Sequence, residues 1–264
     1  MPRPKTKKII VIIVFLLLAL GAALFFNRVN IKSWIQELTR ESVPAPVGIE
    51  EFESENHADY ARVLPNALSL AEAGLPDEFN LDVPFTPQAP FAEWDPTHEE
   101  ACEEASVLMV HYFYQNKKFA GPQEADDEIL KFIEFEKEFL GFFESTTADE
   151  LARAVEAYWG YDIDLIYDFS VDNVKRAIYS GHPVVLPAAG RVLDNPNFQE
   201  PGPVYHMLVI KGWKGDKFIT NDPGTRNGED WLYAYDHLMN SAHDWNGGDV
   251  ERGNKVALIM KIKN

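Results

Sequence analysis

An uncharged run of 18 residues, positions 9–26, most constrains how this chain folds. As a helix rising about 1.5 Å per residue, the run is roughly 27 Å long, close to the thickness of a bilayer's hydrocarbon core. An apolar run with no polar face at a basic N-terminus rarely packs inside a domain, which disfavours a buried helix of a soluble domain. Four basic residues precede it. We therefore expect residues 1–8 to form a cytoplasmic tail, residues 9–26 a single transmembrane anchor, and the remainder to lie outside.

The main alternative is a cleaved signal peptide, whose apolar core is usually shorter. Small residues occur at positions 21–23, but Leu24, Phe25 and Phe26 follow them and leave no clear cleavage site. An anchor predicts a single-pass protein of the cell membrane, whereas cleavage predicts a secreted protein. Residues 27–80 resemble a spacer, rich in Pro and Glu over 41–55, and the globular domain is expected at 81–264.

The charge of the chain restricts its partners. The formal net charge is −18, and after the basic tail the chain carries 20 basic and 42 acidic residues. Such a surface repels nucleic acid, so we expect no nucleic-acid partner. Hydrophobic residues make up 46% of the sequence, which is enough for a core and excludes a wholly disordered chain.

The order of the expected elements predicts an α+β fold, with helices first and an antiparallel sheet later. Apolar spacing and capping signals predict helices over 97–112, 123–140, 147–159 and 171–180. The first of these begins either with Asp95 or with Thr97 as its cap. Runs rich in β-branched and aromatic residues predict strands at 81–85, 183–189, 204–213, 217–221 and 255–262.

Cys102 is the only cysteine, so no intramolecular disulfide is possible. It falls at the start of a predicted helix, where free N–H groups and the helix dipole favour a thiolate. Four flanking glutamates oppose a negative sulfur, although the penalty is small if they are solvated. Cys102 is therefore either an activated nucleophile or a small buried hydrophobe.

A nucleophilic thiol needs a base, and His206 stands out among the seven histidines because it lies within an apolar strand. Sixteen residues later, Asp222 follows the next predicted strand, so a short hairpin would place its carboxylate beside the imidazole. The alternatives are a hydrogen-bonded core histidine and an ordinary turn aspartate. His98 has metal-pair spacing to Cys102, but no further ligand pattern accompanies it, so we expect no metal.

Taken together, these segments resemble the bacteriocin-processing, double-glycine-leader type of cysteine peptidase and its stand-alone relatives. The matching pieces are VPFTPQ at 83–88, Trp94, Ala101-Cys102, YHMLVIKGW at 205–213 and NDPG at 221–224. The resemblance spans residues 81 to about 262. Glu103 departs from it, because that family usually has Gly directly after the cysteine. The gap from Gln88 to Cys102 is also longer than in transporter-linked members. No P-loop is present.

The resemblance implies a papain-like fold, with the nucleophile helix packed on an antiparallel sheet, and no cofactor. It implies that Cys102 attacks an amide carbonyl, that His206 takes its proton and that Asp222 orients the imidazole. Gln88 and the backbone N–H of Cys102 would donate to the oxyanion. The expected function is cysteine-dependent hydrolysis of a peptide or protein substrate at the outer face of the membrane.

Trp94 and Tyr205 are expected to line the substrate site. Three alternatives remain open at this stage. A peptidoglycan amidase or acyl transferase would use the same triad. A catalytically inactive cell-surface binding domain would explain the acidic flanks of Cys102. A cation-binding adhesion domain would use the acidic, Gly-rich loops at 227–230 and 246–249, although neither matches an EF-hand.

Overall fold

The computed structural model describes residues 40–53, 74–167 and 169–263. The predicted cytoplasmic tail and anchor, and most of the predicted spacer, lie outside these residues. Among the described helices, none has the length and apolarity needed to cross a bilayer. Nearly all of the described chain belongs to one unit, Val43–Asn264.

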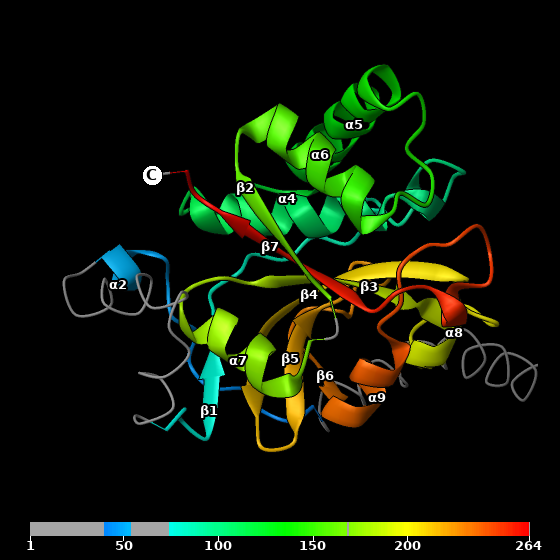
Figure 1. Cartoon of the computed structure of the whole chain (residues 1–264). Helices are drawn as coiled ribbons and strands as arrows, with labels where there is room; N and C mark the ends of the chain where they lie inside the picture. The colour runs from blue at the N-terminus through cyan, green and yellow to red at the C-terminus, as the bar shows by residue number, and fades with distance from the viewer. Residues whose placement is uncertain (1–39, 54–73, 168, 264) are drawn as a thin grey trace, which may run out of the picture. The chain divides into compact units, whose positions relative to one another are not determined.

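A seven-stranded antiparallel sheet organises this unit, in the order β2-β7-β3-β4-β5-β6, with β1 paired to β4 (Figure 1). β4 is the longest strand. β3 pairs with its first part and β1 continues along the same edge, opposite β5. The strands are β1 (Glu78–Asn80), β2 (Asp162–Tyr167), β3 (Val184–Ala189), β4 (Tyr205–Lys214), β5 (Lys217–Asn221), β6 (Trp231–Ala234) and β7 (Val256–Lys261).

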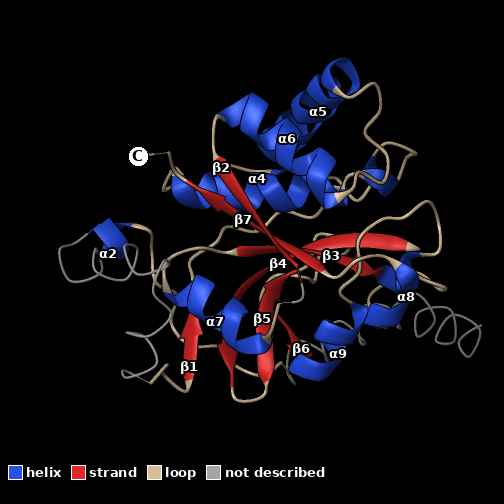
Figure 2. Ribbon diagram, in the orientation of Figure 1, coloured by secondary structure: helices blue, strands red, loops and turns tan. Residues whose placement is uncertain are grey.

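Helices cover the sheet on both sides: α4, α5 and α6 gather on one side and α7 on the other (Figure 2). α6 starts at a capping box in which Thr147 and Glu150 satisfy each other's backbone N–H groups. The helices are α2 (Glu50–Glu53), η1 (His98–Glu100), α4 (Cys102–Tyr114), α5 (Pro122–Phe139), α6 (Ala148–Trp159), α7 (Val171–Tyr179), α8 (Gly190–Leu193), α9 (Tyr235–Ser241) and η2 (Val250–Arg252).

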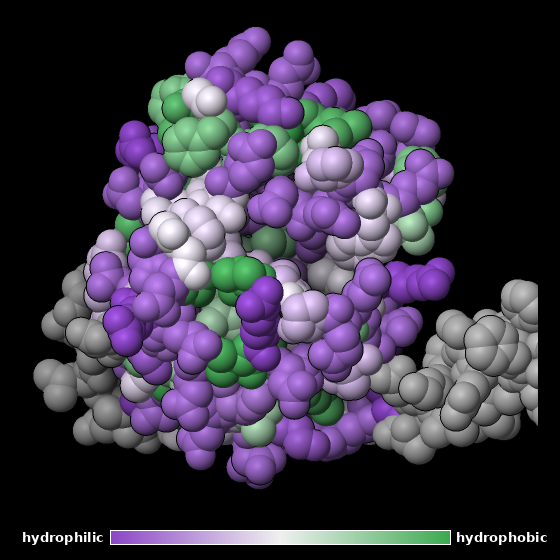
Figure 3. Space-filling model, turned by 90° about the vertical axis from the view of Figure 1, so that its right-hand side faces the viewer, coloured by the Kyte–Doolittle hydropathy of each residue, from purple (hydrophilic) through white to green (hydrophobic). Residues whose placement is uncertain are grey.

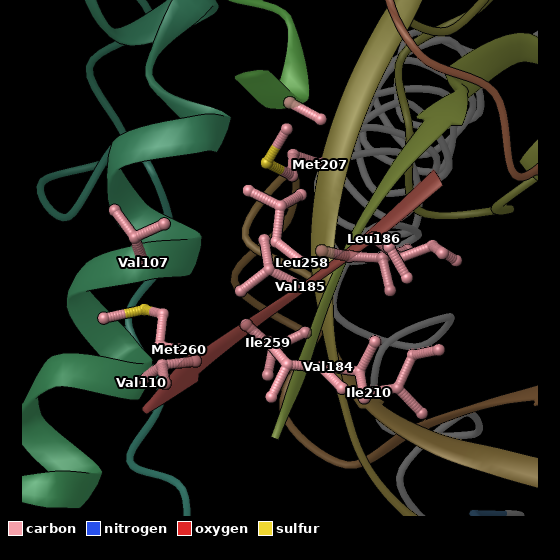
Figure 4. Packing of buried hydrophobic residues seen from close by; sticks show 14 of the residues in the cluster. Val107, Val110, Val184, Val185, Leu186, Met207, Ile210, Leu258, Ile259 and Met260 are labelled. Carbon is pink, nitrogen blue, oxygen red and sulfur yellow. The ribbon is translucent and has the colours of Figure 1, made fainter. Parts of the chain in front are cut away.

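The core lies between α4 and the strands. Val107 and Val110 of α4 face Met260 of β7, with Val185 of β3 nearby (Figure 4). All four side chains are almost fully buried. Burial of each such side chain contributes about 1.5–3 kcal/mol, so this layer fixes the position of α4 on the sheet. The surface is different: the face in Figure 3 is mainly hydrophilic, with apolar groups near its centre.

The α+β arrangement predicted from sequence is confirmed, and most predicted elements end within two residues of the observed ones. The strand predicted at 81–85 is wrong. Pairing with β4 stops at Asn80, and Leu81 instead bridges Val47. Pro84 has no N–H to continue a ladder. The unit begins at Val43 rather than at 81, because Val47 and Ile49 pack onto it. β2 and β6 were not predicted.

Candidate active site

Cys102 is the first residue of α4, and a separate turn, η1, leads into it. Asp95 Oδ1 accepts the backbone N–H groups of Thr97 and His98, both at 2.9 Å. Thr97 makes no side-chain cap, so Asp95 is the residue that caps this turn. The helix predicted over 97–112 is nevertheless interrupted at Ala101, and α4 begins only at Cys102. The sulfur is therefore held at the beginning of a helix whose other end is packed in the core.

His206 and Asp222 meet across adjacent strands, as the hairpin argument predicted. His206 lies in β4 and Asp222 follows β5 directly, and the register between these strands brings position 221 opposite 209. His206 Nε2 lies 2.8 Å from Asp222 Oδ1, and both side chains are buried. Within the described chain, the Nδ1 atom of the same ring has no hydrogen-bond partner, so it is free for chemistry.

Asp222 is held by further donors. Tyr233 Oη donates to its Oδ2 at 2.7 Å, Asn195 Nδ2 donates to the same oxygen at 2.9 Å, and the N–H of Gly224 donates to Oδ1 at 3.0 Å. Burial alone would raise the pKa of Asp222, but the charge of His206 and these hydrogen bonds outweigh it. The net pKa lies below its ordinary value, so the carboxylate is ionised and favours a charged imidazole.

Two glycines allow the turn after Asp222 to close over this pair. A Cβ on Gly228 would lie 1.8 Å from the backbone oxygen of Asp222, and one on Gly224 would lie 2.8 Å from His206 Cε1. The backbone N–H of Asp222 donates to the carbonyl of Gly228 at 3.0 Å. Any larger residue at these positions would push the carboxylate or the imidazole out of place.

The thiol of Cys102 is hydrogen-bonded to a carboxyl group. Its Sγ lies 2.9 Å from Glu103 Oε2 and also receives the backbone N–H of Met207. Among the described residues, no hydrogen bond joins it to His206. Burial raises the pKa of Cys102 well above its ordinary value, and the neighbouring Glu103 carboxyl group raises it further. The expectation that the helix dipole would favour a thiolate is therefore wrong for this arrangement, because desolvation and the neighbouring carboxyl outweigh it.

Two of the glutamates that flank Cys102 are not solvated. Glu103 and Glu104 are buried, and Glu104 meets Glu136 of α5, which is buried as well. Burial raises the pKa of all three carboxyl groups, that of Glu136 to about 8. The structure corrects the assumption of a solvated acidic face. The reason is that Glu104 packs against Glu136 of α5, while Glu103 lies beside the sulfur of Cys102.

Cys102 and His206 line one cavity of about 910 Å³. Trp94 and Tyr205, predicted to bind substrate, line it too, but they differ: Trp94 is exposed, whereas Tyr205 is buried and donates its hydroxyl to the carbonyl of Thr146 at 3.0 Å. Other residues of the lining are Glu103, Phe198, Arg226 and Trp245.

Gln88 also lines the cavity, but its amide is committed elsewhere. Nε2 donates to the carbonyls of His98 at 2.8 Å and Glu99 at 3.1 Å, and Oε1 has no partner among the described residues. Gln88 thus ties its own loop to η1. To act as the predicted oxyanion donor, it would have to exchange one of these bonds for a bond to substrate.

The remaining candidates have structural roles. His98 bonds Asp95 through Nδ1 and Asp126 through Nε2, both at 2.9 Å, which accounts for both ring nitrogens. Across the described ranges, no group of three or more His, Cys, Asp or Glu side chains is arranged to hold a metal.

Sequence reasoning missed Asn195 and Tyr233, which both contact Asp222. Neither residue lies in a motif, and they come from different parts of the chain. Only the folding of β6 and the loop after α8 brings them to the carboxylate, so no sequence signal pointed to them.

Comparison with known proteins gives a family match over the part of the chain that holds these residues. The model of the Peptidase_C39 like family matches residues 80–248, which include Gln88, Cys102, His206 and Asp222. No curated protein matches the chain. A crystal structure of a Bacillus anthracis protein described as a C39-like peptidase aligns with a TM-score of 0.48 at 15% identity, covering 72% of this chain and 99% of that one.

Proposed function

Because the chain belongs to the C39-like peptidase family and is a cysteine peptidase-like enzyme, we propose that it hydrolyses peptide bonds with Cys102 as nucleophile and His206 as base. Asp222 orients the imidazole and stabilises its charged form. The observation that carries the proposal is the buried pair of His206 and Asp222 beside the cavity that also contains Cys102.

In the proposed reaction, Sγ turns from Glu103 toward His206 Nδ1, the ring nitrogen left free by Asp222. The thiol proton passes to Nδ1 as sulfur attacks the carbonyl carbon. The backbone N–H of Cys102, at the start of α4, donates to the oxyanion. His206 then protonates the leaving amine, and water releases the acyl group from sulfur.

The proposal extends to location. If residues 9–26 form an anchor, the catalytic unit works at the outer face of the membrane and meets extracytoplasmic peptides or proteins. The uncharged run and the basic residues before it support this placement. The segments that match at 83–88, 205–213 and 221–224 support a peptidase of the bacteriocin-processing type.

A cleavage assay tests the reaction. The full chain in detergent is incubated with mixed unstructured peptides, and new N-termini are identified by mass spectrometry. We expect cleavage by wild type, none by Cys102→Ala, and a loss of at least about 100-fold in His206→Ala. Cleavage by Cys102→Ala would refute the proposal. Release of stem peptides from peptidoglycan without cleavage of linear peptides would favour the amidase alternative instead.

A further inference from the structure

The residue after the cysteine occupies the reaction centre. Glu103 is only 1% exposed and lines the same cavity as Cys102 and His206. Its Oε2 lies 2.9 Å from Sγ, and its Oε1 is buried with no hydrogen-bond partner in the described chain. The fold thus places a carboxyl group, with one oxygen unused, beside the sulfur that is proposed to react.

The site also lacks a side-chain donor for the oxyanion among the residues predicted to supply one. Gln88 is the expected donor, but its Nε2 already donates to the carbonyls of His98 and Glu99. Donors to an oxyanion lie about 2.7–3.1 Å from the oxygen, which itself is attached to the carbon bonded to sulfur. A carboxyl group with one oxygen 2.9 Å from Sγ is near enough to reach an oxyanion that forms on the same side of the sulfur.

The surroundings of Glu103 determine its protonation. The titratable groups that face it are Cys102 and Glu104 on α4, Glu100 of η1, Glu136 of α5, and Tyr205 and His206 of β4. Three of these six are carboxyl groups, and each disfavours a further negative charge. Burial, followed by the charge of Glu104, raises the pKa of Glu103 well above its ordinary value, which favours the protonated carboxyl over the carboxylate.

We propose that Glu103, whose carboxyl group lies beside the sulfur in the same cavity, is a catalytic residue that donates a hydrogen bond to the oxyanion formed when Cys102 attacks. This inference rests on the proposed peptidase function. In the step, the S–C bond forms, the carbonyl π pair moves to oxygen and the thiol proton goes to His206 Nδ1. The Glu103 proton stays on Glu103. When the intermediate collapses, the C–N bond breaks and His206 gives its proton to the amine.

The sign of the pH effect follows. The active form carries the proton, so acylation is fastest below the pKa of Glu103 in the folded protein and falls as pH rises through it. Above that pKa the donor is lost, and the carboxylate repels both the thiolate and the oxyanion.

The test compares acylation rates in single turnover, between pH 5 and pH 9, in the full chain. Glu103→Gln keeps an N–H donor but cannot ionise, so we expect it to stay within about tenfold of wild type and to lose the descending limb. Glu103→Ala should acylate about 100-fold to 1,000-fold more slowly at every pH, with little change in KM. Glu156→Gln, the same change on the exposed face of α6, is the matched control and should follow wild type.

Three outcomes would overturn the inference: Glu103→Ala at the wild-type rate, Glu103→Gln as slow as Glu103→Ala, or Glu103→Gln faster than wild type at neutral pH. A second readout needs no turnover. The infrared difference spectrum of wild type minus Glu103→Gln should contain the C=O stretch of a protonated carboxyl group at neutral pH. A carboxylate band in its place would also overturn the inference. If wild type shows no peptidase activity, the proposed function is refuted. The infrared measurement still shows whether Glu103 is protonated.

Discussion

The buried carboxyl pair of Glu104 and Glu136 makes the stability of this fold depend on pH in an unusual direction. Both side chains are fully buried, and none of their four carboxyl oxygens has a donor among the described residues. The two groups nevertheless lie within hydrogen-bonding reach of each other. Two carboxylates cannot share this space, so at least one must be protonated.

The size of the effect follows from the pKa of Glu136, which burial raises from 4.5 to about 8. Between these two values the unfolded chain releases a proton that the folded chain keeps, so the free energy of unfolding falls as pH rises. A difference of one pKa unit between the folded and unfolded chain changes the free energy of unfolding by about 1.4 kcal/mol. The whole interval for Glu136 therefore contributes several kcal/mol at most. The contribution is complete below pH 4.5 and is lost as pH approaches 8.

Glu136→Gln removes the titration and keeps the shape of the side chain. We expect urea unfolding, followed by Trp fluorescence, to show similar stability for the variant and wild type near pH 5. By pH 8 the variant should be more stable by a few kcal/mol, with an unchanged m-value. Glu138→Gln, two residues along α5 and exposed, is the matched control. Parallel stability curves for wild type and Glu136→Gln would refute the reasoning.

Three further substitutions separate the site from the scaffold. Tyr233→Phe removes the 2.7 Å hydrogen bond to Asp222, which is worth about 1.5–3 kcal/mol, and should lower kcat/KM about tenfold or more on a cleaved peptide; an unchanged value would contradict the role of this contact. Gly228→Ala places a Cβ 1.8 Å from the backbone oxygen of Asp222, and should lower both Tm and activity; a normal Tm would show that the turn yields. Thr147→Ala loses the N-cap of α6 and should cost about 1 kcal/mol in urea unfolding with peptide cleavage unchanged; reduced cleavage would link α6 to the site.

Short-range patterns in the sequence predicted much of the fold. The helix predicted at 147–159 matches α6, and the apolar run around His206 predicted β4. The meeting of His206 and Asp222 was also predictable, because two strands joined by a short turn must lie side by side. In each case the deciding residues are close in sequence.

The features that could not be predicted from the sequence depend on packing between segments that are far apart in the chain. Glutamates at the start of a helix ordinarily face water, and nothing local indicates that Glu103 and Glu104 are buried. The commitment of Gln88 to the carbonyl groups of η1 likewise depends on how two loops meet. These contacts decide the charge of the site, so its electrostatics could not be inferred from spacing alone.

The most direct test of the account traps the nucleophile. A peptidyl acyloxymethyl ketone, built on a sequence that wild type cleaves, is reacted with the full chain, and the adduct is located by mass spectrometry. The account predicts one adduct on Cys102 and inactivation at least about 100-fold slower in His206→Ala. Equal inactivation rates in the two proteins, or a folded wild type that forms no adduct, would contradict the pairing of Cys102 with His206.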